Sequence, residues 1–432
     1  MQRRHSFSLI QNQSTRIIVL FPSSYHIAVR RRVEPSRSRG RPRRRAHTHY
    51  GRQGSGSLEE KKSSMELVGR VRRLLTQGGA TEDSDADDVG APIRVGLVGA
   101  SNISKFAMIN AASRRKDVEV RAVATRTPGK AREFAATNGI PVAHDDFASL
   151  FADETIDAVY ISVVTEEHLN LGLQALRAGK HVLLEKPLAL DAQEARELRD
   201  AAKEHNVVLM EAMHYKHHPA LKRLRELVET EAVGTVQEID VCFAKFDASA
   251  WGIGGKYTPE KLRTKMLDRW IYCIDLVQLL APGRKVKTVC SAEDAGFIVR
   301  GELELCDRDD ERKGLVRATW EADAQTVRIL PAWVATVQCA EGKLVLQNFN
   351  FPSLYHRLYI EPTNGPARVE THYGEVGKTT FEYQLDAFCR AVRERHVDSL
   401  VPPEASVATL EIVDKVRAAF ADSENERKNE SD

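Results

Sequence analysis

The stretch Ile93-Arg-Val-Gly-Leu-Val-Gly99 decides the fold of this 432-residue chain. Its β-branched and leucine residues predict a short buried strand that ends at a glycine, where the chain can turn tightly. Residues 104–113 follow with a pattern that continues as a helix. A strand, a glycine turn and a helix in this order are typical of the start of a nucleotide-binding βαβ unit.

The same alternation continues through residues 92–213. Further strands are expected at Val118–Thr125, Thr155–Val164, Val182–Leu184 and Val207–Met210, with helices at 130–138, 166–178 and 191–205. Because short connections join strands to helices in turn, the strands are predicted to form one parallel, doubly wound sheet. The sequence thus predicts an α/β fold that begins with a Rossmann domain.

The turn after the first strand departs from the dinucleotide fingerprint G-x-G-x-x-G. The three glycine positions hold Gly99, Ser101 and Ser104. Gly99 still provides the tight turn, and the serine hydroxyls, with the helix start at Asn102 and Ile103, are expected to face a pyrophosphate. By spacing alone, the segment is equally compatible with an ordinary strand–helix turn.

The end of the second strand indicates which cofactor would bind. NAD sites usually carry an acid there to hydrogen-bond the ribose 2′-hydroxyl, whereas this chain has Thr125-Arg126. A guanidinium binds a 2′-phosphate through two hydrogen bonds, and a carboxylate would repel it. We therefore expect NADP rather than NAD, unless Arg126 is a solvated arginine on a surface turn.

The run Ala178-Gly-Lys-His-Val-Leu-Leu-Glu-Lys186-Pro187 ends a buried strand in Glu-Lys-Pro. It places Lys186 at the carboxyl edge of the predicted sheet, where open α/β sheets bind ligands. A partly desolvated lysine can transfer a proton near neutral pH, although a lysine at a strand end is by itself more often a solvated charge.

Three segments together resemble the Gfo/Idh/MocA family of oxidoreductases. They are Gly96-Leu-Val-Gly-Ala-Ser101, Ala178–Leu190 and Met210-Glu-Ala-Met-His-Tyr-Lys-His-His-Pro219. The likeness covers about residues 92–421 and is greatest to NADP-dependent D-xylose 1-dehydrogenases and dimeric dihydrodiol dehydrogenases. It implies a Rossmann domain, then a second α/β domain with a large, mostly antiparallel open sheet. The activity it implies is hydride transfer between NADP and an aldose such as D-xylose, or a trans-dihydrodiol.

The resemblance also implies roles for single residues. Lys186 matches the lysine that contacts substrate and nicotinamide ribose, Glu185 the acid beside it, and Pro187 a proline often cis in the family. Thr165 matches a residue that lines the nicotinamide pocket, and His168 ends the family's T-x-x-H. The usual T-P-N turn reads Thr-Glu-Glu here, so the cofactor contacts of this turn are in doubt.

The family's other signature, D-x-G-x-Y/H-x-x-D, matches Asp268, Tyr272 and Asp275. Spacings of four and three residues place these side chains on one helical face, predicted to be catalytic, although a half-exposed polar face is the alternative. We expect Tyr272 to be the acid–base group, its pKa lowered by the charge of Lys186; the reverse assignment is also compatible. Trp270 stands where the family has glycine, so its indole is expected to narrow the pocket or shift the helix.

A second functional class has the same fold. A catalytically inactive NADP(H)-binding sensor or regulatory partner would explain Trp270 and the altered turns. The presence of both Lys186 and Tyr272 favours the enzyme.

Residues 214–421 are predicted to form the substrate domain. Strands are expected at Val236–Phe246, Lys287–Cys290, Gly296–Leu305, Leu315–Ala322, Trp333–Cys339 and Lys343–Gln347, and helices at 380–395 and 404–421. An open sheet must cover its apolar side, which predicts a homodimer. Residues 422–432 are expected to be a charged, frayed tail.

Residues 1–91 are predicted to be a disordered extension, rich in arginine and serine over the first fifty residues and acidic at 81–88. For residues 1–64 the alternatives are a mitochondrial or plastid transit peptide, a nucleic-acid or nuclear-import patch, and sequence upstream of a true start at Met65. A nucleic-acid role would depend on these arginines alone.

The overall composition is that of an ordinary soluble protein, with 42% apolar residues and a formal net charge of +2. No run of about 18 apolar residues predicts a membrane helix. The six cysteines form no CxxC pair, which favours reduced thiols in a reducing compartment and argues against a metal site. We expect a cytoplasmic protein, unless the extension directs it to an organelle.

Overall fold

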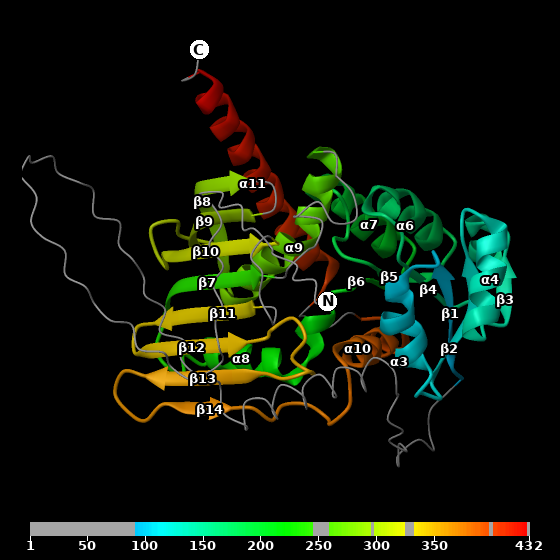
Figure 1. Cartoon of the computed structure of the whole chain (residues 1–432), viewed down its shortest axis with the longest axis horizontal. Coiled ribbons are helices and arrows are strands. Elements are labelled where there is room, and N and C mark those ends of the chain that lie inside the picture. Colours follow the sequence, from blue (N-terminus) through cyan, green and yellow to red (C-terminus); the bar gives the residue numbers. More distant parts are fainter. Residues whose placement is uncertain (1–90, 245–258, 295–297, 325–331, 397–400, 430–432) are drawn as a thin grey trace, which may run out of the picture.

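The computed structural model describes residues 91–244, 259–294, 298–324, 332–396 and 401–429 (Figure 1). The expected disorder, transit peptide and nucleic-acid patch at the amino-terminal end lie outside the described residues. Within the described part of the chain, no helix is both long and apolar enough to span a membrane.

Six parallel strands form the first sheet, in the order β3-β2-β1-β4-β5-β6. Their bounds are β1 Ile93–Val98, β2 Val118–Ala124, β3 Val142–His144, β4 Ala158–Ile161, β5 His181–Leu184 and β6 Leu209–Glu211. The helices that join them include α4 Pro128–Asn138, α5 Phe147–Ala152, α6 His168–Arg177 and α7 Ala192–Glu204. The predicted doubly wound sheet is confirmed, and its order reverses between β1 and β4, where such sheets bind ligands.

Two elements of this domain were not expected, β3 and α5. Strand β3 has only three half-buried residues, too few to show a period of two. The strand expected from Thr155 begins instead at Ala158, because Asp153 holds a turn there: its Oδ1 accepts the Thr155 N–H at 2.8 Å.

The helix expected over 104–113 is interrupted just after the glycine turn. It consists of α2 Asn102–Ser104, a π-helical turn η1 Lys105–Ile109 and α3 Asn110–Ala112. Single π turns inside helices frequently lie at functional sites.

Eight strands form the second sheet, in the order β14-β13-β12-β11-β7-β10-β9-β8. Their bounds are β7 Val236–Ala244, β8 Arg284–Asp294, β9 Ile298–Asp307, β10 Val316–Asp323, β11 Ala332–Cys339, β12 Gly342–Gln347, β13 Arg357–Pro362 and β14 Arg368–Glu370. Only β7 and β10 pair in parallel, so the predicted mostly antiparallel sheet is confirmed, with β13 and β14 as additions.

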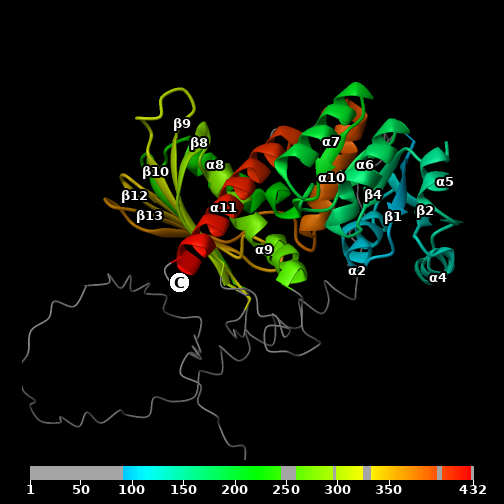
Figure 2. The same ribbon diagram turned by 90° about the horizontal axis from the view of Figure 1, so that it is seen from above.

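Helices pack on the side of this sheet that faces the Rossmann domain (Figure 2). The connecting segment η3 His214–His217 leads into α8 Pro219–Glu229; α9 Pro259–Leu280, α10 Thr380–Glu394 and α11 Pro403–Asn429 follow. No described helix covers the opposite face. Helix α11 continues to Asn429, past the expected end at 421, and the charged, frayed tail expected from 422 stays a prediction.

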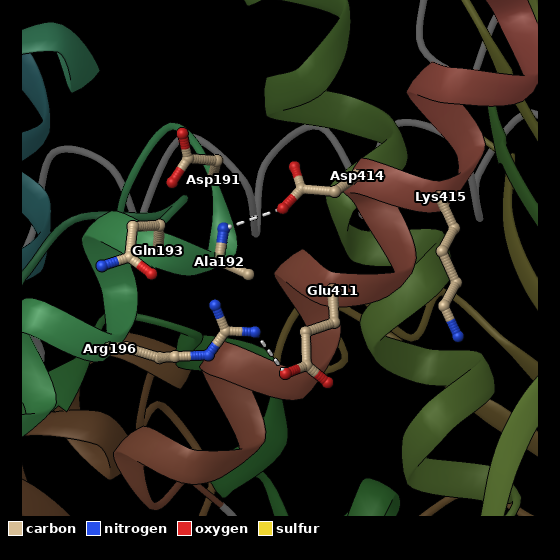
Figure 3. A pocket seen from close by; sticks show the side chains of 7 residues that line it. All are labelled: Asp191, Ala192, Gln193, Arg196, Glu411, Asp414 and Lys415. Atoms are coloured by element: carbon tan, nitrogen blue, oxygen red, sulfur yellow. Dashed lines mark hydrogen bonds and ion pairs between the residues drawn. The ribbon is translucent and has the colours of Figure 1, made fainter.

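The last two helices join the domains. On α10, Glu382 pairs with Arg114 at 3.0 Å and Arg393 with Asp117 at 3.0 Å. Helix α11 packs along α7 and leaves an open groove of about 550 Å³ between them (Figure 3). The lining residues are Asp191, Ala192, Gln193, Arg196, Glu411, Asp414 and Lys415.

Candidate active site

The residues predicted to bind a cofactor lie at one edge of the first sheet. Gly99 follows β1, Thr125 follows β2, Lys186 follows β5, and Thr165 begins the 3₁₀ helix η2 Thr165–Glu167 shortly after β4. Because these strands are parallel, all four positions lie at carboxyl ends, around the reversal between β1 and β4.

Gly99 is required by its surroundings. Its φ is +101°, and a Cβ at this position would lie 3.0 Å from Val163 Cγ1 and 3.1 Å from the Ser162 carbonyl oxygen. A side chain would therefore be strained and would push β1 away from the chain that follows β4.

The serines of the turn are linked to each other. Ser101, Ser104 and Ser162 form a triangle of hydroxyls with oxygen–oxygen distances of 2.7–2.9 Å. Ser104 is fully buried, so the expectation that its hydroxyl faces a pyrophosphate is wrong. Ser101 caps the first turn, and the N–H groups of exposed Asn102 and half-buried Ile103 have no partner within the helix.

Arg126 is exposed at the end of β2. Its neighbour Thr125 is buried, with its hydroxyl donating to the Thr127 carbonyl at 2.6 Å, so Thr125 shapes the turn. A free guanidinium at this position fits a 2′-phosphate.

Lys186 extends from the Rossmann domain to α9. Its Nζ donates to the Asp268 carbonyl oxygen at 3.1 Å and pairs with Asp268 Oδ1 at 3.2 Å. The same atom lies 5.1 Å from the centroid of the Tyr272 ring, where the ring face attracts a cation. The Lys186–Pro187 peptide bond is cis. Three of the four predicted catalytic residues therefore meet at one point between the domains.

The neighbours of Lys186 keep its ammonium protonated. Burial lowers the pKa of Lys186, but its interactions with Tyr272, Asp268 and Glu185 outweigh burial and raise it above its ordinary value. Burial in turn raises the pKa of Glu185, whose Oε1 accepts the Tyr160 hydroxyl at 2.5 Å. A fixed positive charge suits Lys186 better than the role of base.

The Tyr272 ring is enclosed by aromatic side chains. Phe243 stacks on it at 5.3 Å with an angle of 7°, and His214 and Tyr215 approach edge-on at 6.3 and 5.7 Å. Burial raises the pKa of Tyr272, and the opposing charge of Lys186 does not offset this. The expectation that Lys186 brings this pKa below its ordinary value is wrong, and the phenol is protonated at neutral pH.

Asp268 and Asp275 share a face of α9 but differ in exposure. The Asp268 side chain is 47% exposed beside Lys186. Asp275 is buried: Oδ1 pairs with Lys216 Nζ at 2.6 Å and Oδ2 accepts the Tyr215 hydroxyl. With both oxygens engaged, Asp275 holds η3 against α9 in this structure, and its catalytic role stays a prediction.

His168 also lies inside the protein. It is 1% exposed; Nδ1 donates to the Pro187 carbonyl at 2.9 Å, and Nε2 lies 3.3 Å from the Val163 carbonyl oxygen. Burial lowers the pKa of His168, which favours the neutral ring. The ring contacts the backbone after Lys186, and the expected cofactor contact of His168 stays a prediction.

Trp270 packs into the core. Its ring stacks on Trp320 of β10 at 5.3 Å and 15° and meets Phe420 of α11 edge-on. The expectation that the indole narrows the substrate pocket is wrong, because it fills the space between α9 and the second sheet.

Replacing Trp270 by alanine is expected to destabilise the protein by about 3–5 kcal/mol, since it removes a buried aromatic side chain. Urea denaturation followed by circular dichroism measures the loss, and Trp270→Phe, which keeps a stacked ring, should lose less. Unchanged stability with an altered KM would instead indicate a pocket-lining indole.

Two exposed apolar side chains at the cofactor edge were missed. Val164, 58% exposed, follows β4, and Phe106, 37% exposed, lies on η1. The sequence suggested Val164 as the end of a buried strand. A large apolar side chain exposed at this edge suits contact with a planar ring.

His214 adds a neutral group near the pair. It is buried, and its Nδ1 lies 2.9 Å from Thr380 Oγ1. Burial and the charge of Lys186 lower the pKa of His214 to about 3. Within the described residues, no cluster of three or more His, Cys, Asp or Glu is placed to hold a metal ion.

Comparison with known proteins agrees with this geometry. The sequence profile of the family "Oxidoreductase family, NAD-binding Rossmann fold", GFO_IDH_MocA, matches residues 93–213. A trans-1,2-dihydrobenzene-1,2-diol dehydrogenase of Xenopus laevis is 34% identical over 173 residues, 40% of this chain and 52% of that protein. The chain thus spans about half the length of this curated relative.

Two further comparisons extend over both domains. An NADP-dependent D-xylose 1-dehydrogenase of Haloferax volcanii is 28% identical over 74% of this chain and 95% of its own length. A 3-ketoreductase from Actinomadura kijaniata, solved with NADP and TDP-benzene, shares the fold with a TM-score of 0.62 and 23% identity, covering 76% of this chain and 98% of that one. The family match is to the first domain: residues 93–213 belong to the Gfo/Idh/MocA family of oxidoreductases.

Proposed function

We propose that this protein is an NADP-dependent oxidoreductase that transfers a hydride between the nicotinamide and a sugar, of the D-xylose type, or a trans-dihydrodiol. The observation that carries the proposal is Lys186 Nζ over the Tyr272 ring, beside an open Asp268, at the cofactor edge. Relatives named for a diol and for D-xylose support the two substrate classes.

The residues of this chain would divide the work as follows. Exposed Arg126 would bind the 2′-phosphate, the N–H groups after Gly99 the pyrophosphate, and exposed Phe106 and Val164 would flank planar rings. When bound, NADP supplies the hydride acceptor, or as NADPH the hydride donor.

A side chain of the protein exchanges the proton with the substrate. Tyr272 donates its phenolic proton to the substrate oxygen in reduction and takes it back in oxidation. Lys186 stays protonated, orients the substrate oxygen and stabilises negative charge on it and on the phenolate. Asp268 fixes the ammonium and leaves one carboxylate oxygen for a sugar hydroxyl.

The raised pKa of Tyr272 predicts opposite pH responses for the two directions. Below its pKa the phenol is protonated, so reduction should be nearly constant between about pH 6 and 9, whereas oxidation, which needs the phenolate, should rise about tenfold per pH unit. Initial rates in both directions with matched substrate and product test this. An oxidation rate that is flat over this range would contradict Tyr272 as the base.

Replacing Arg126 by alanine is expected to weaken NADPH binding about 10- to 100-fold, since charge-assisted hydrogen bonds are lost, and to leave NADH binding unchanged. Fluorescence titration of the bound nicotinamide measures both. Arg132→Ala removes an exposed arginine of α4 and serves as the control. Equal losses for NADPH and NADH would exclude a 2′-phosphate contact.

The direct test is a reduction screen with NADP and NAD against pentoses, hexoses and trans-dihydrodiols. Turnover with NADP and one of these classes supports the proposal. Tight NADPH binding without turnover on any of them would favour a sensor or regulatory partner.

A homodimer is proposed on the open face of the second sheet, and light scattering of the full chain tests it.

A further inference from the structure

The peptide group that follows Lys186 and Pro187 is held from both sides. Its oxygen, the Pro187 carbonyl, accepts from His168 Nδ1 at 2.9 Å, and its N–H, that of Leu188, donates to Glu211 Oε1 at 2.7 Å. Both hydrogen bonds are buried, and both side chains are fully enclosed, at 1% and 4% exposure. One peptide plane is thereby fixed in orientation by two side chains at once.

The two side chains come from elements on either side of β5. His168 is the first residue of α6, which follows β4 and the 3₁₀ helix η2, and Glu211 is the last residue of β6. Both therefore lie on regular elements, and Glu211 is positioned by the sheet itself.

Glu211 is braced from the other domain. Its second oxygen, Oε2, accepts the Ser406 hydroxyl of α11 at 2.6 Å. The same helix holds the rest of the segment. Arg417 Nη1 donates to the Leu190 carbonyl at 2.6 Å. Asp414 Oδ2 accepts the Ala192 N–H at 3.0 Å, the contact drawn in Figure 3.

The burial of the Glu211 carboxylate calls for an explanation, because burying an acid costs free energy unless it is fully hydrogen-bonded. The pKa of Glu211 is raised to about 7, because burial and the charge of Asp275 together outweigh the Ser406 hydrogen bond and the charge of Lys216, which lower it. An apolar side chain would carry no such cost. What the carboxylate adds is an acceptor aimed at the Leu188 N–H.

We propose that His168 and Glu211 form a clamp on the Pro187–Leu188 peptide group that sets where Lys186 Nζ meets Tyr272 and Asp268, so that Glu211 is a positioning residue. This inference rests on the proposed function for its kinetic consequence. Pro187 is the only residue between Lys186 and the clamped plane, and its ring fixes φ, so little freedom separates the clamp from the lysine.

The test compares Glu211→Ala, Glu211→Gln and a matched control in the full-length protein. Glutamine keeps an oxygen for the Leu188 N–H and a donor for Ser406, and alanine keeps neither. The control is His181→Ala at the opposite end of the same two strands, where His181 Nδ1 accepts the Val208 N–H at 2.9 Å. It removes the same kind of buried contact between β5 and β6, away from Lys186.

Glu211→Ala is expected to lower kcat about 30-fold or more with the Kd for NADPH unchanged, Glu211→Gln to stay within about threefold of the wild type at pH 8, and His181→Ala to leave kcat unchanged. Equal losses of kcat in Glu211→Ala and His181→Ala would overturn the proposal, because general loosening of the sheet would then explain both.

A second readout needs no substrate. Each unit by which the pKa of Lys186 falls should speed its acetylation about tenfold below that pKa. Mass spectrometry after brief acetic anhydride treatment at pH 8 should therefore show faster labelling of Lys186, relative to exposed Lys203, in Glu211→Ala only. Unchanged Lys186 labelling overturns the clamp whether or not a substrate is known, whereas faster labelling in a protein without turnover supports the clamp and counts only against the proposed activity.

If Glu211→Ala fails to fold, Ser406→Ala replaces it. That variant leaves Glu211 in place and removes its brace from α11. It should show the same faster labelling of Lys186 to a smaller degree, and labelling equal to the wild type would overturn the proposal.

Discussion

Lys186→Met is expected to lower kcat for NADP-dependent turnover about 10³-fold, within the range for loss of a group that stabilises the reacting oxygen. Methionine keeps a similar length and apolar stem but removes the ammonium that contacts Asp268 and the Tyr272 ring. Steady-state kinetics with the substrate found in the screen measures the loss, together with the NADPH Kd, which should change little.

Lys203→Met provides the matched control, since Lys203 is exposed in the last turn of α7. Its kinetics should equal those of the wild type. A Lys186→Met enzyme that retains full activity would contradict the assignment of the active site to Lys186. The open groove between α7 and α11 would then be the next candidate for the active site.

Tyr272→Phe is expected to lower kcat about 10²- to 10³-fold and to remove the pH dependence of oxidation, because the phenolic proton is the one that moves. The substitution keeps the ring stacked on Phe243, so the packing of α9 on the second sheet is retained. Rates from pH 6 to 9, with thermal unfolding of the same samples, separate lost chemistry from lost stability.

Tyr359→Phe is the corresponding control, since this half-buried tyrosine on β13 loses only a hydroxyl away from the site. Full activity of Tyr272→Phe with an unshifted pH profile would reassign the proton to another group.

Much of the fold could be predicted because buried positions hold apolar residues, and the pattern of apolar residues along the sequence indicates the strands. Strand β5 is wholly buried and carries the apolar run Val-Leu-Leu after His181, and β12 alternates buried and half-buried residues along its length. Strand β3 and helix α5 could not be predicted in the same way, because a three-residue strand has no period to detect.

The site was predictable as a set of residues but not as a set of roles. Lys186, Tyr272 and Asp268 meet as the motifs indicate, whereas Asp275 and His168 share those motifs and are buried contacts of the backbone and of η3. Spacing along a helix determines which face a side chain is on. Spacing does not determine how far a side chain is buried. For Tyr272, burial raises the pKa by more than the positive charge of Lys186 lowers it.

The helices that join the domains affect how the chain folds during synthesis. Helices α10 and α11 are made last, yet α10 pairs with the loop before β2 and α11 holds the segment after Lys186. At about 5–20 residues per second, they leave the ribosome on the order of 10 s or more after β6. Until then the nascent cofactor domain lacks two of its supports, so a chain cut short after β14 should be a poor nicotinamide binder even though every residue of the nucleotide turn is present.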